Sequence, residues 1–313
     1  MSSSTGPTSL ERDFATVEDD LWRTIQRGFL SQGEPLPAVV YHYTSAPAFY
    51  GILQERCIWA TDCRQLGDPK EGRYADEMFA DVVERASTTN ESPQVRALAT
   101  ELGKRRRENL PSPVYDSRLF VASFSKNGND LSQWRMYADD GRGFSMALRT
   151  AGLRPPQADW VHVIYDEGRL SACLHSLLVI MVMKMQEFAT AKSVRVEDVV
   201  PLAAASIDSV VLKLRPFFKH TAYSGEAEWR LAKVVYYPFE SSIEVRARGP
   251  SLISYSPIPI ADVDGCIPLG VSYFGPAQEP DWHTAWDVVR ASGHGARLDV
   301  GFSISGLPYR STR

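Results

Sequence analysis

The chain has 313 residues, of which 44% are hydrophobic and 23% charged, so it is long enough to bury a substantial core. The formal net charge is −4, which excludes a uniformly basic surface for nucleic acid but leaves a local basic patch open. The four cysteines are scattered without metal-ligand spacing, so we expect reduced thiols and no metal site.

The first residues of the chain contain no apolar signal core. The most apolar stretch, 174–185, is shorter than the roughly 20 residues that a membrane-spanning helix needs. We therefore expect a cytoplasmic protein that does not enter a membrane, with 174–185 inside a buried helix.

Hydrophobic spacing and turn residues predict the elements in chain order. Helices are expected over 10–30, 46–55, 74–86, 94–108, 131–138, 170–189, 199–217 and 282–291. Strands are expected over 38–43, 57–61, 119–125, 144–148, 160–165, 228–237, 253–258, 263–269 and 300–304. Because strands and helices do not alternate regularly, the pattern indicates an α+β fold with mixed or antiparallel sheets and inserted helices. We expect a tail and helix over 1–36, followed by one α+β domain over 37–313 with a helical insertion at about 170–217.

The first candidate for chemistry lies at the end of the strand 38–43, where His42 stands between two tyrosines. A histidine in this place can bond a ribose hydroxyl, and Tyr43 or Tyr137 can offer a ring face to a pyridinium ring. The alternatives are a structural histidine and core tyrosines. Thr44 is either a ligand contact or part of a cap for the next helix.

Two serines alternate with apolar residues in the strand 119–125. This spacing places Ser123 and Ser125 on one face of the strand. Buried hydroxyls that face the same way need partners, which a polar ligand or a carboxylate would supply. Ordinary hydrogen bonds between strands are the alternative.

Two glutamates precede the strand 228–237. Glu226 and Glu228 share a face if the chain is extended there. Paired carboxylates suit an oxocarbenium-like transition state, because one stabilises positive charge and the other accepts a proton from a nucleophile. The alternative is a solvated strand edge paired with Arg230 or Lys219.

Several cations are candidates for an anionic ligand. Arg142 lies between two glycines, which lets backbone and guanidinium approach a phosphate together. The segment Lys219-His220 and Arg310 are further candidates. The basic run 104–107 ends a helix, where it forms either a solvated face or a phosphate contact.

These segments resemble the bacterial family called domain of unknown function 2971. The resemblance rests on 41–45, 58–60, Asp68-Pro69, Phe124-Ser125, 134–138, Arg142-Gly143, 228–230, Ser303 and 308–310. It extends over residues 38–310, and the family name implies no activity.

The early His-x-Thr, middle Ser-x-Ser and late Glu-x-Glu also resemble the motif order of ADP-ribosyltransferases. This resemblance implies their fold, NAD as the substrate and a macromolecular acceptor, which is a protein or a nucleic acid. A toxin or a phage-defence component would fit. The alternatives are a non-catalytic nucleotide or nucleic-acid sensor on the same fold and an NAD glycohydrolase.

The resemblance also implies roles for the candidate residues. His42 would hold the nicotinamide ribose, and Ser123 or Ser125 would orient Glu228. Glu228 would bind the ribose 2-hydroxyl and stabilise the cation as nicotinamide leaves. Glu226 would help to activate the acceptor, while Arg142 would contact the pyrophosphate, and Tyr43, Thr44 and Tyr137 would line the site.

Overall fold

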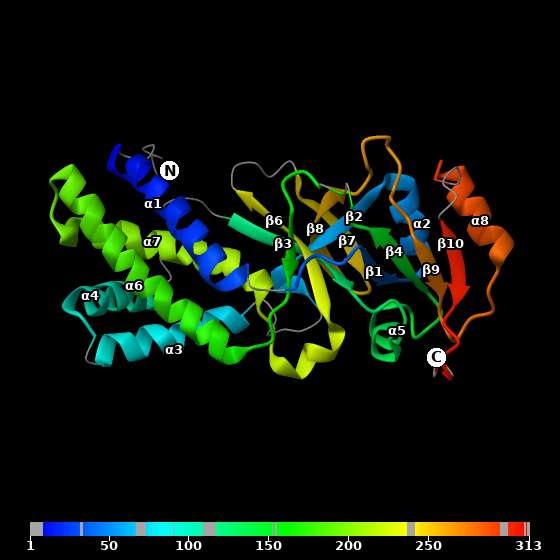
Figure 1. Cartoon of the computed structure of the whole chain (residues 1–313), viewed down its shortest axis with the longest axis horizontal. Coiled ribbons are helices and arrows are strands. Elements are labelled where there is room, and N and C mark those ends of the chain that lie inside the picture. The colour runs from blue at the N-terminus through cyan, green and yellow to red at the C-terminus, as the bar shows by residue number, and fades with distance from the viewer. Residues whose placement is uncertain are drawn as a thin grey trace.

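The computed structural model describes residues 9–31, 34–66, 73–89, 91–108, 117–151, 153, 155–236, 242–294, 300–309 and 311. Helices and a large mixed sheet make up the molecule, so the predicted α+β class is confirmed. A group of long helices occupies one end of the long axis and the sheet occupies the rest (Figure 1). We call these parts the helical body and the sheet body.

The helical body gathers helices from three separate stretches of the chain. Its members are α1 (Ser9–Ile25) with its continuation η1 (Gln26–Leu30), α3 (Tyr74–Thr88), α4 (Pro93–Arg107), α6 (Glu167–Lys192) and α7 (Val196–Leu214). Their apolar faces form one continuous core. The helices expected at about 170–217 therefore do not stand alone, because α1, α3 and α4 pack with them. Helix α6 is long and apolar enough to cross a membrane, yet many of its apolar residues lie in this core.

The basic run at the end of α4 is partly internal. Arg105 is buried and donates to Asp208 of α7 at 3.0 Å. The Arg106 guanidinium lies over the ring of Phe79 of α3, 4.7 Å from its centroid. Two of the four cations therefore hold helices together, which limits this run as a solvated face or as a phosphate contact.

The sheet body contains ten described strands. They are β1 (Val39–Thr44), β2 (Cys57–Asp62), β3 (Ser117–Ser125), β4 (Phe144–Arg149), β5 (Asp159–His162), β6 (Glu228–Tyr236), β7 (Glu244–Arg248), β8 (Ser251–Pro259), β9 (Val271–Phe274) and β10 (Gly301–Ile304). The main order is β10-β9-β4-β1-β3-β2-β8-β7, with β6 on β3 and β5 on β6. Only β9 and β10 are parallel among the described pairs. Three further helices belong to this body: α2 (Ala46–Glu55), α5 (Leu131–Tyr137) and α8 (Trp282–Ala291).

The prediction of a strand over 263–269 is wrong. The Asp262 side chain accepts from the backbone N–H of Asp264 and Cys266, and Gly265 has a φ of +73°, so a turn forms instead. Conversely, β7 and β9 were missed. Strand β7 is a mostly exposed edge strand of alternating charged and small residues, so no apolar face marks it in the sequence.

Strand β3 is bordered differently on its two sides. Along one side it pairs with β6 over its whole length. On the other side, among the described pairs, it meets β1 at Ser125 and β2 at Phe120 and Val121. Strand β1 is also paired with β4, and β2 is also paired with β8. Strands β1 and β2 therefore diverge beside Ser123. We call this place, between the pairs Tyr41–Ser125 and Thr61–Val121, the strand fork.

Candidate functional site

His42 of β1 lies in the strand fork and contacts β3. Its Nδ1 is 2.9 Å from the backbone oxygen of Ser123. A carbonyl oxygen only accepts hydrogen bonds, so we assign the proton to Nδ1, which leaves Nε2 as an acceptor. Burial lowers the pKa of His42, and the charge of Arg246 lowers it further, so the ring is neutral at pH 7.

The two serines of β3 share one face, as their spacing predicts, but they do different things. The Ser125 hydroxyl is buried, donates to the backbone oxygen of Glu226 at 2.8 Å and accepts from the N–H of Asn127. Ser123 is exposed, and its side chain shares the ladder face of Glu228 and helps to lower the pKa of that carboxyl. Ser125 therefore fixes the turn before β6, and Ser123 contacts the glutamate itself.

The two glutamates converge, although the chain between them is not extended. Glu226 ends the turn η4 (Thr221–Glu226), Ala227 has a φ of +45°, and Glu228 begins β6. The expected common strand face is therefore wrong. Instead, both carboxylates reach the ammonium of Lys219, at 2.6 Å from Glu226 and 3.2 Å from Glu228.

Arg230 completes a buried group that we call the charge cluster: Lys219, Glu226, Glu228 and Arg230. Arg230 donates to both carboxylate oxygens of Glu228, each at 2.9 Å. Glu228 and Lys219 are each 4% exposed, and Arg230 is 1% exposed. Lys219 and Arg230 are the partners named in the structural alternative for Glu228. The pairs are buried rather than solvated, so they matter more to stability than surface pairs do.

The charge cluster keeps Glu228 ionised. Burial by itself raises the pKa of Glu228, but Arg230 and Lys219 outweigh it, with a hydrogen bond from Ser123, and lower the pKa to about 2. The two carboxylates of the cluster are matched by two cationic side chains.

We expect stability to fall in two steps as the pH decreases. Burial lowers the pKa of both His42 and His162 below the ordinary 6.5, so the unfolded chain binds these protons more readily. Their contribution is present above pH 6.5 and is lost as the pH falls below it. The contribution of Glu228 is present above its ordinary pKa of 4.5 and is lost as the pH falls towards about 2.

Urea unfolding over a pH series measures both steps. His162 stacks on Trp229, with ring centroids 4.8 Å apart, so His162→Phe keeps a ring there and should shrink the first step. Unchanged stability between about pH 7 and about pH 5 would contradict the assignment of two buried neutral histidines.

The other two predicted ligand contacts on β1, Tyr43 and Thr44, are both buried. The Tyr43 hydroxyl donates to the backbone oxygen of Asn127 and accepts from the N–H of Asp130, and its ring packs edge-on against Trp134. Thr44 is 5% exposed and pairs with Phe144. In this conformation neither offers a free face to a ligand.

Tyr137 of α5 has a different setting. It is 48% exposed, and its hydroxyl is 3.3 Å from a carboxylate oxygen of Glu226. The structure therefore brings an exposed aromatic ring to the edge of the charge cluster, from an element far from β6 in the sequence.

The residues predicted to contact an anionic ligand lie in different parts of the structure. Arg142 binds Asp139 within its own turn, at 3.1 Å. The His220 side chain caps the turn η4 by accepting from the N–H of Ala222. Lys219 belongs to the charge cluster, and Arg310 lies outside the described residues.

Sequence reasoning missed Arg246 of β7. Its guanidinium carbon lies 5.1 Å from the ring centroid of Trp59 and 5.6 Å from that of Tyr255, and it donates to the Thr61 hydroxyl at 3.3 Å. Its Nε is buried without a hydrogen-bond partner among the described residues. The register from β7 through β8 and β2 to β3 puts Arg246 on the same sheet face as Ser123. No sequence signal on this exposed edge strand marks it.

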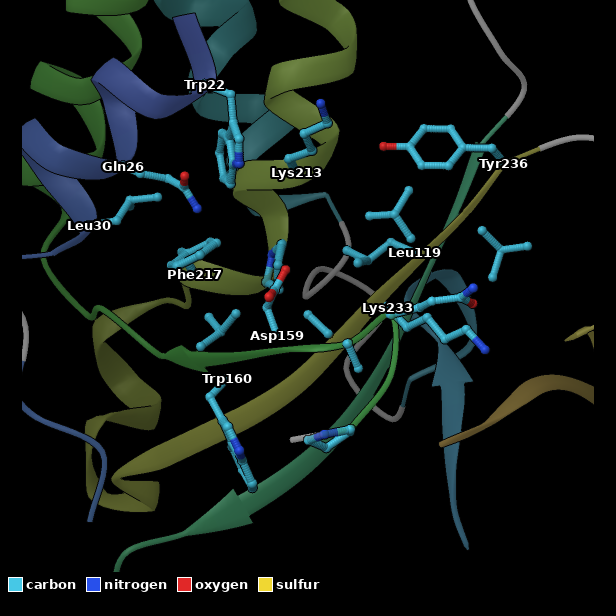
Figure 2. Close-up of a pocket in the computed structure, with 18 of the residues that line it drawn as sticks. Trp22, Gln26, Leu30, Leu119, Asp159, Trp160, Lys213, Phe217, Lys233 and Tyr236 are labelled. Carbon is cyan, nitrogen blue, oxygen red and sulfur yellow. The ribbon is translucent and has the colours of Figure 1, made fainter. Parts of the chain in front are cut away.

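The largest described pocket lies elsewhere. Figure 2 shows it between the helical body and strands β3, β5 and β6, with a volume of about 1200 Å³. None of the predicted site residues lines it. The candidate site is therefore defined by hydrogen bonds and ion pairs at the strand fork rather than by a deep cavity.

Comparison with known proteins finds a family model that matches part of the chain. No curated protein and no solved structure matches the chain. A family model described as "Protein of unknown function (DUF2971)" matches residues 133–231, from α5 to β6. The match contains Tyr137, Arg142 and the whole charge cluster, whereas His42 and β3 precede it. Residues 133–231, the part that carries the paired glutamates, are therefore similar to the DUF2971 family.

Proposed function

We propose that this protein is an NAD-dependent ADP-ribosyltransferase whose site lies at the strand fork. One observation supports the proposal: His42, Ser123 and Glu228 lie on β1, β3 and β6, and β3 is the neighbour of the other two strands. His42 bonds the backbone of Ser123, and the Ser123 side chain shares the β3–β6 ladder face of Glu228 and helps to lower its pKa. Three motifs far apart in the sequence thus come to three adjacent strands. An ADP-ribosyltransferase-like fold is part of this proposal.

Glu228 would stabilise the transition state. A carboxylate that stays ionised at pH 7 favours the positive charge that develops on the ribose as the bond to nicotinamide breaks. Arg230 and Lys219 occupy its inner side. Ser123, its exposed partner, is the group that a ribose 2-hydroxyl would replace. His42 Nε2 would accept from another ribose hydroxyl.

Glu226 would serve the acceptor. The nicotinamide leaves with the bonding electron pair, and the acceptor nucleophile forms the new bond to the ribose carbon. The proton of the nucleophile passes to Glu226. Its position beside the exposed Tyr137 supports this role, because an approaching protein or nucleic acid would meet Tyr137 first.

Nicotinamide release tests the proposal. Purified protein is incubated with NAD, and free nicotinamide is measured for the wild type and for Glu228→Gln. Release that depends on Glu228 supports the chemistry. Mass spectrometry of the products then separates transfer to a macromolecule from transfer to water, which would make the protein an NAD glycohydrolase. A cytoplasmic toxin or phage-defence component remains the biological role that we propose.

A non-catalytic nucleotide or nucleic-acid sensor is the second candidate. The observation that favours it is the burial of the charge cluster, in which both glutamates already have cationic partners. On this alternative, ligand binding survives Glu228→Gln and weakens as salt is added. NAD that shifts the melting temperature without nicotinamide release would favour the sensor.

Arg246 and Arg142 make a matched pair for locating the phosphates of NAD. We expect Arg246→Met to raise KM for NAD by about tenfold with little change in kcat, because a charge-assisted contact to phosphate is lost. Arg142→Met should leave KM within about twofold, since Arg142 is engaged with Asp139 in its own turn. Initial rates of nicotinamide release measure both. The reverse order would place the phosphates at the turn before β4.

A further inference from the structure

The segment that follows β10 runs beside α5 from one end of this helix to the other. Figure 1 shows this part of the chain next to α5. Residues 305–309 and Ser311 form neither helix nor strand. Every second residue among them, at 305, 307, 309 and 311, contacts α5 or the segments that flank it. We call residues 305–309 and Ser311 the clasp.

The clasp contacts the start of α5 through Ser305. The Asn129 side chain donates to the backbone oxygen of Ser305 at 2.6 Å and accepts from the Ser305 hydroxyl at 2.6 Å. The same Asn129 oxygen accepts from the indole N–H of Trp134 at 2.9 Å. Two positions further on, Leu307 packs on the buried cluster that contains Trp134. These contacts tie the first part of α5 to the clasp.

The clasp contacts the turn after α5 through Tyr309 and Ser311. Both hydroxyls donate to the carboxylate of Asp140, that of Ser311 at 2.7 Å. This turn is strained, because Asp139, Asp140 and Gly141 have φ angles of +48°, +55° and +81° in succession. Left-handed residues cost energy and persist where surrounding contacts hold them. Asp140 is 8% exposed, so its bonds to the clasp are shielded from water.

Tyr309 also fits closely against Gly141. A Cβ added to Gly141 would lie 3.0 Å from the Tyr309 ring, which is closer than a side chain tolerates without movement of the ring. Glycine therefore serves two needs here, the positive φ and the close approach of the ring. The turn and the clasp are thus fitted to each other.

The turn and the candidate site are neighbours along the chain. Tyr137 is the last residue of α5, and its hydroxyl is 3.3 Å from a carboxylate oxygen of Glu226. Helix α5 has seven residues, whereas isolated helices shorter than about 12 residues are marginal in water. Its place therefore depends on the contacts at its two ends, which the clasp supplies.

We propose that the clasp positions Tyr137 beside Glu226 by holding both ends of α5, which makes Tyr309 and Asp140 positioning residues for the acceptor step. This inference rests on the proposed transferase, in which Glu226 takes the proton of the acceptor and Tyr137 meets the acceptor first. Tyr309 and Asp140 act through the turn and α5 rather than on a substrate.

A fluorine label on Tyr137 tests the positioning without any reaction. Protein that carries 3-fluorotyrosine at position 137 gives a fluorine resonance that reports the surroundings of this ring. We expect it to differ from that of free 3-fluorotyrosine, and Tyr309→Ala and Gly141→Ala should move it towards the free value. Asp140→Asn keeps an oxygen acceptor and tolerates positive φ, so it should leave the resonance in place, whereas Asp140→Ala should move it.

Two matched variants separate the clasp from general effects. Tyr50→Ala removes a tyrosine of α2 that is 52% exposed. Gly249→Ala adds a Cβ at a φ of +58° with no heavy atom within 4 Å. Both should leave the resonance unchanged, and melting temperatures show that the variants are folded. A wild-type resonance in both Tyr309→Ala and Gly141→Ala would overturn the proposal.

Nicotinamide release then tests the role in the reaction. We expect Tyr309→Ala to lower kcat by about tenfold or more, because a displacement of about 1 Å near reacting groups is costly. KM for NAD should stay within about twofold, since none of the contacts described for the clasp involves His42 or Arg246. Unchanged kcat, with or without a rise in KM, would overturn the positioning role. If the wild type releases no nicotinamide, the transferase fails, and the fluorine resonance alone decides whether the clasp positions Tyr137.

Discussion

Glu228→Gln is expected to reduce nicotinamide release from NAD by about a hundredfold or more, the usual cost of removing one group that stabilises transition-state charge. The wild-type carboxylate is ionised at pH 7 because Arg230 and Lys219 lower its pKa. Glutamine keeps the shape but not the charge that an oxocarbenium-like ribose needs. Single-turnover measurement of free nicotinamide separates this loss from weaker NAD binding.

Two further variants guard against misfolding as the cause. Glu187→Gln changes an exposed glutamate of α6 and should release nicotinamide like the wild type. Ser123→Ala removes an exposed hydroxyl that helps to lower the pKa of Glu228, so it should fold normally and slow release. Wild-type release by both Glu228→Gln and Ser123→Ala would remove the strand fork from the reaction and leave the sensor in first place.

Arg230→Gln is expected to lower the free energy of unfolding by about 3–5 kcal/mol, the cost of removing one partner from a buried ion pair. Arg230 is 1% exposed, donates to both oxygens of Glu228 and also bonds the backbone oxygen of Pro216. Its removal leaves Lys219 as the one cation of the cluster, and Lys219 is already paired with Glu226. Urea unfolding at pH 7 measures the change.

A double-mutant cycle identifies the ion pair as the source of this effect. Arg230→Gln combined with Glu228→Gln should cost less than the sum of the two single changes, because the second change removes the uncompensated charge. Arg142→Gln, which breaks an exposed pair with Asp139, should cost less than about 1 kcal/mol. Additive costs at Arg230 and Glu228 would mean that packing, not charge, holds the cluster together.

Much of the fold follows from local sequence patterns. The sequence predicts the strand β3 and the helix α6 correctly, because the spacing of their apolar residues matches the residues that are buried. The turn at 262–265 and the edge strand β7 were misread for the opposite reason, since an aspartate side chain and a strand without an apolar face both break the pattern.

The sequence predicted only part of the geometry of the candidate site. Motif order singled out His42, Ser123 or Ser125, and Glu228; in the structure His42 contacts the backbone of Ser123, and Ser125 pairs with Glu228 between β3 and β6. The spacing of Glu226 and Glu228 predicted that both lie on one strand face. Ala227 between them adopts a left-handed conformation, and both carboxylates pair with Lys219 instead. Spacing describes an extended chain and gives no warning of a turn within it.

The sequence by itself determined most of the helices and strands, because hydrophobic period, caps and turn residues act over a few neighbouring positions. Only the tertiary structure decided the partners of the charges. Lys219 and Arg230 neutralise the glutamates, and Arg246 stacks on Trp59, across strands that are distant in the chain. The helical body likewise assembles from three stretches around one core. Burial makes each of these pairings strong, and burial is a property of the packed chain rather than of any segment.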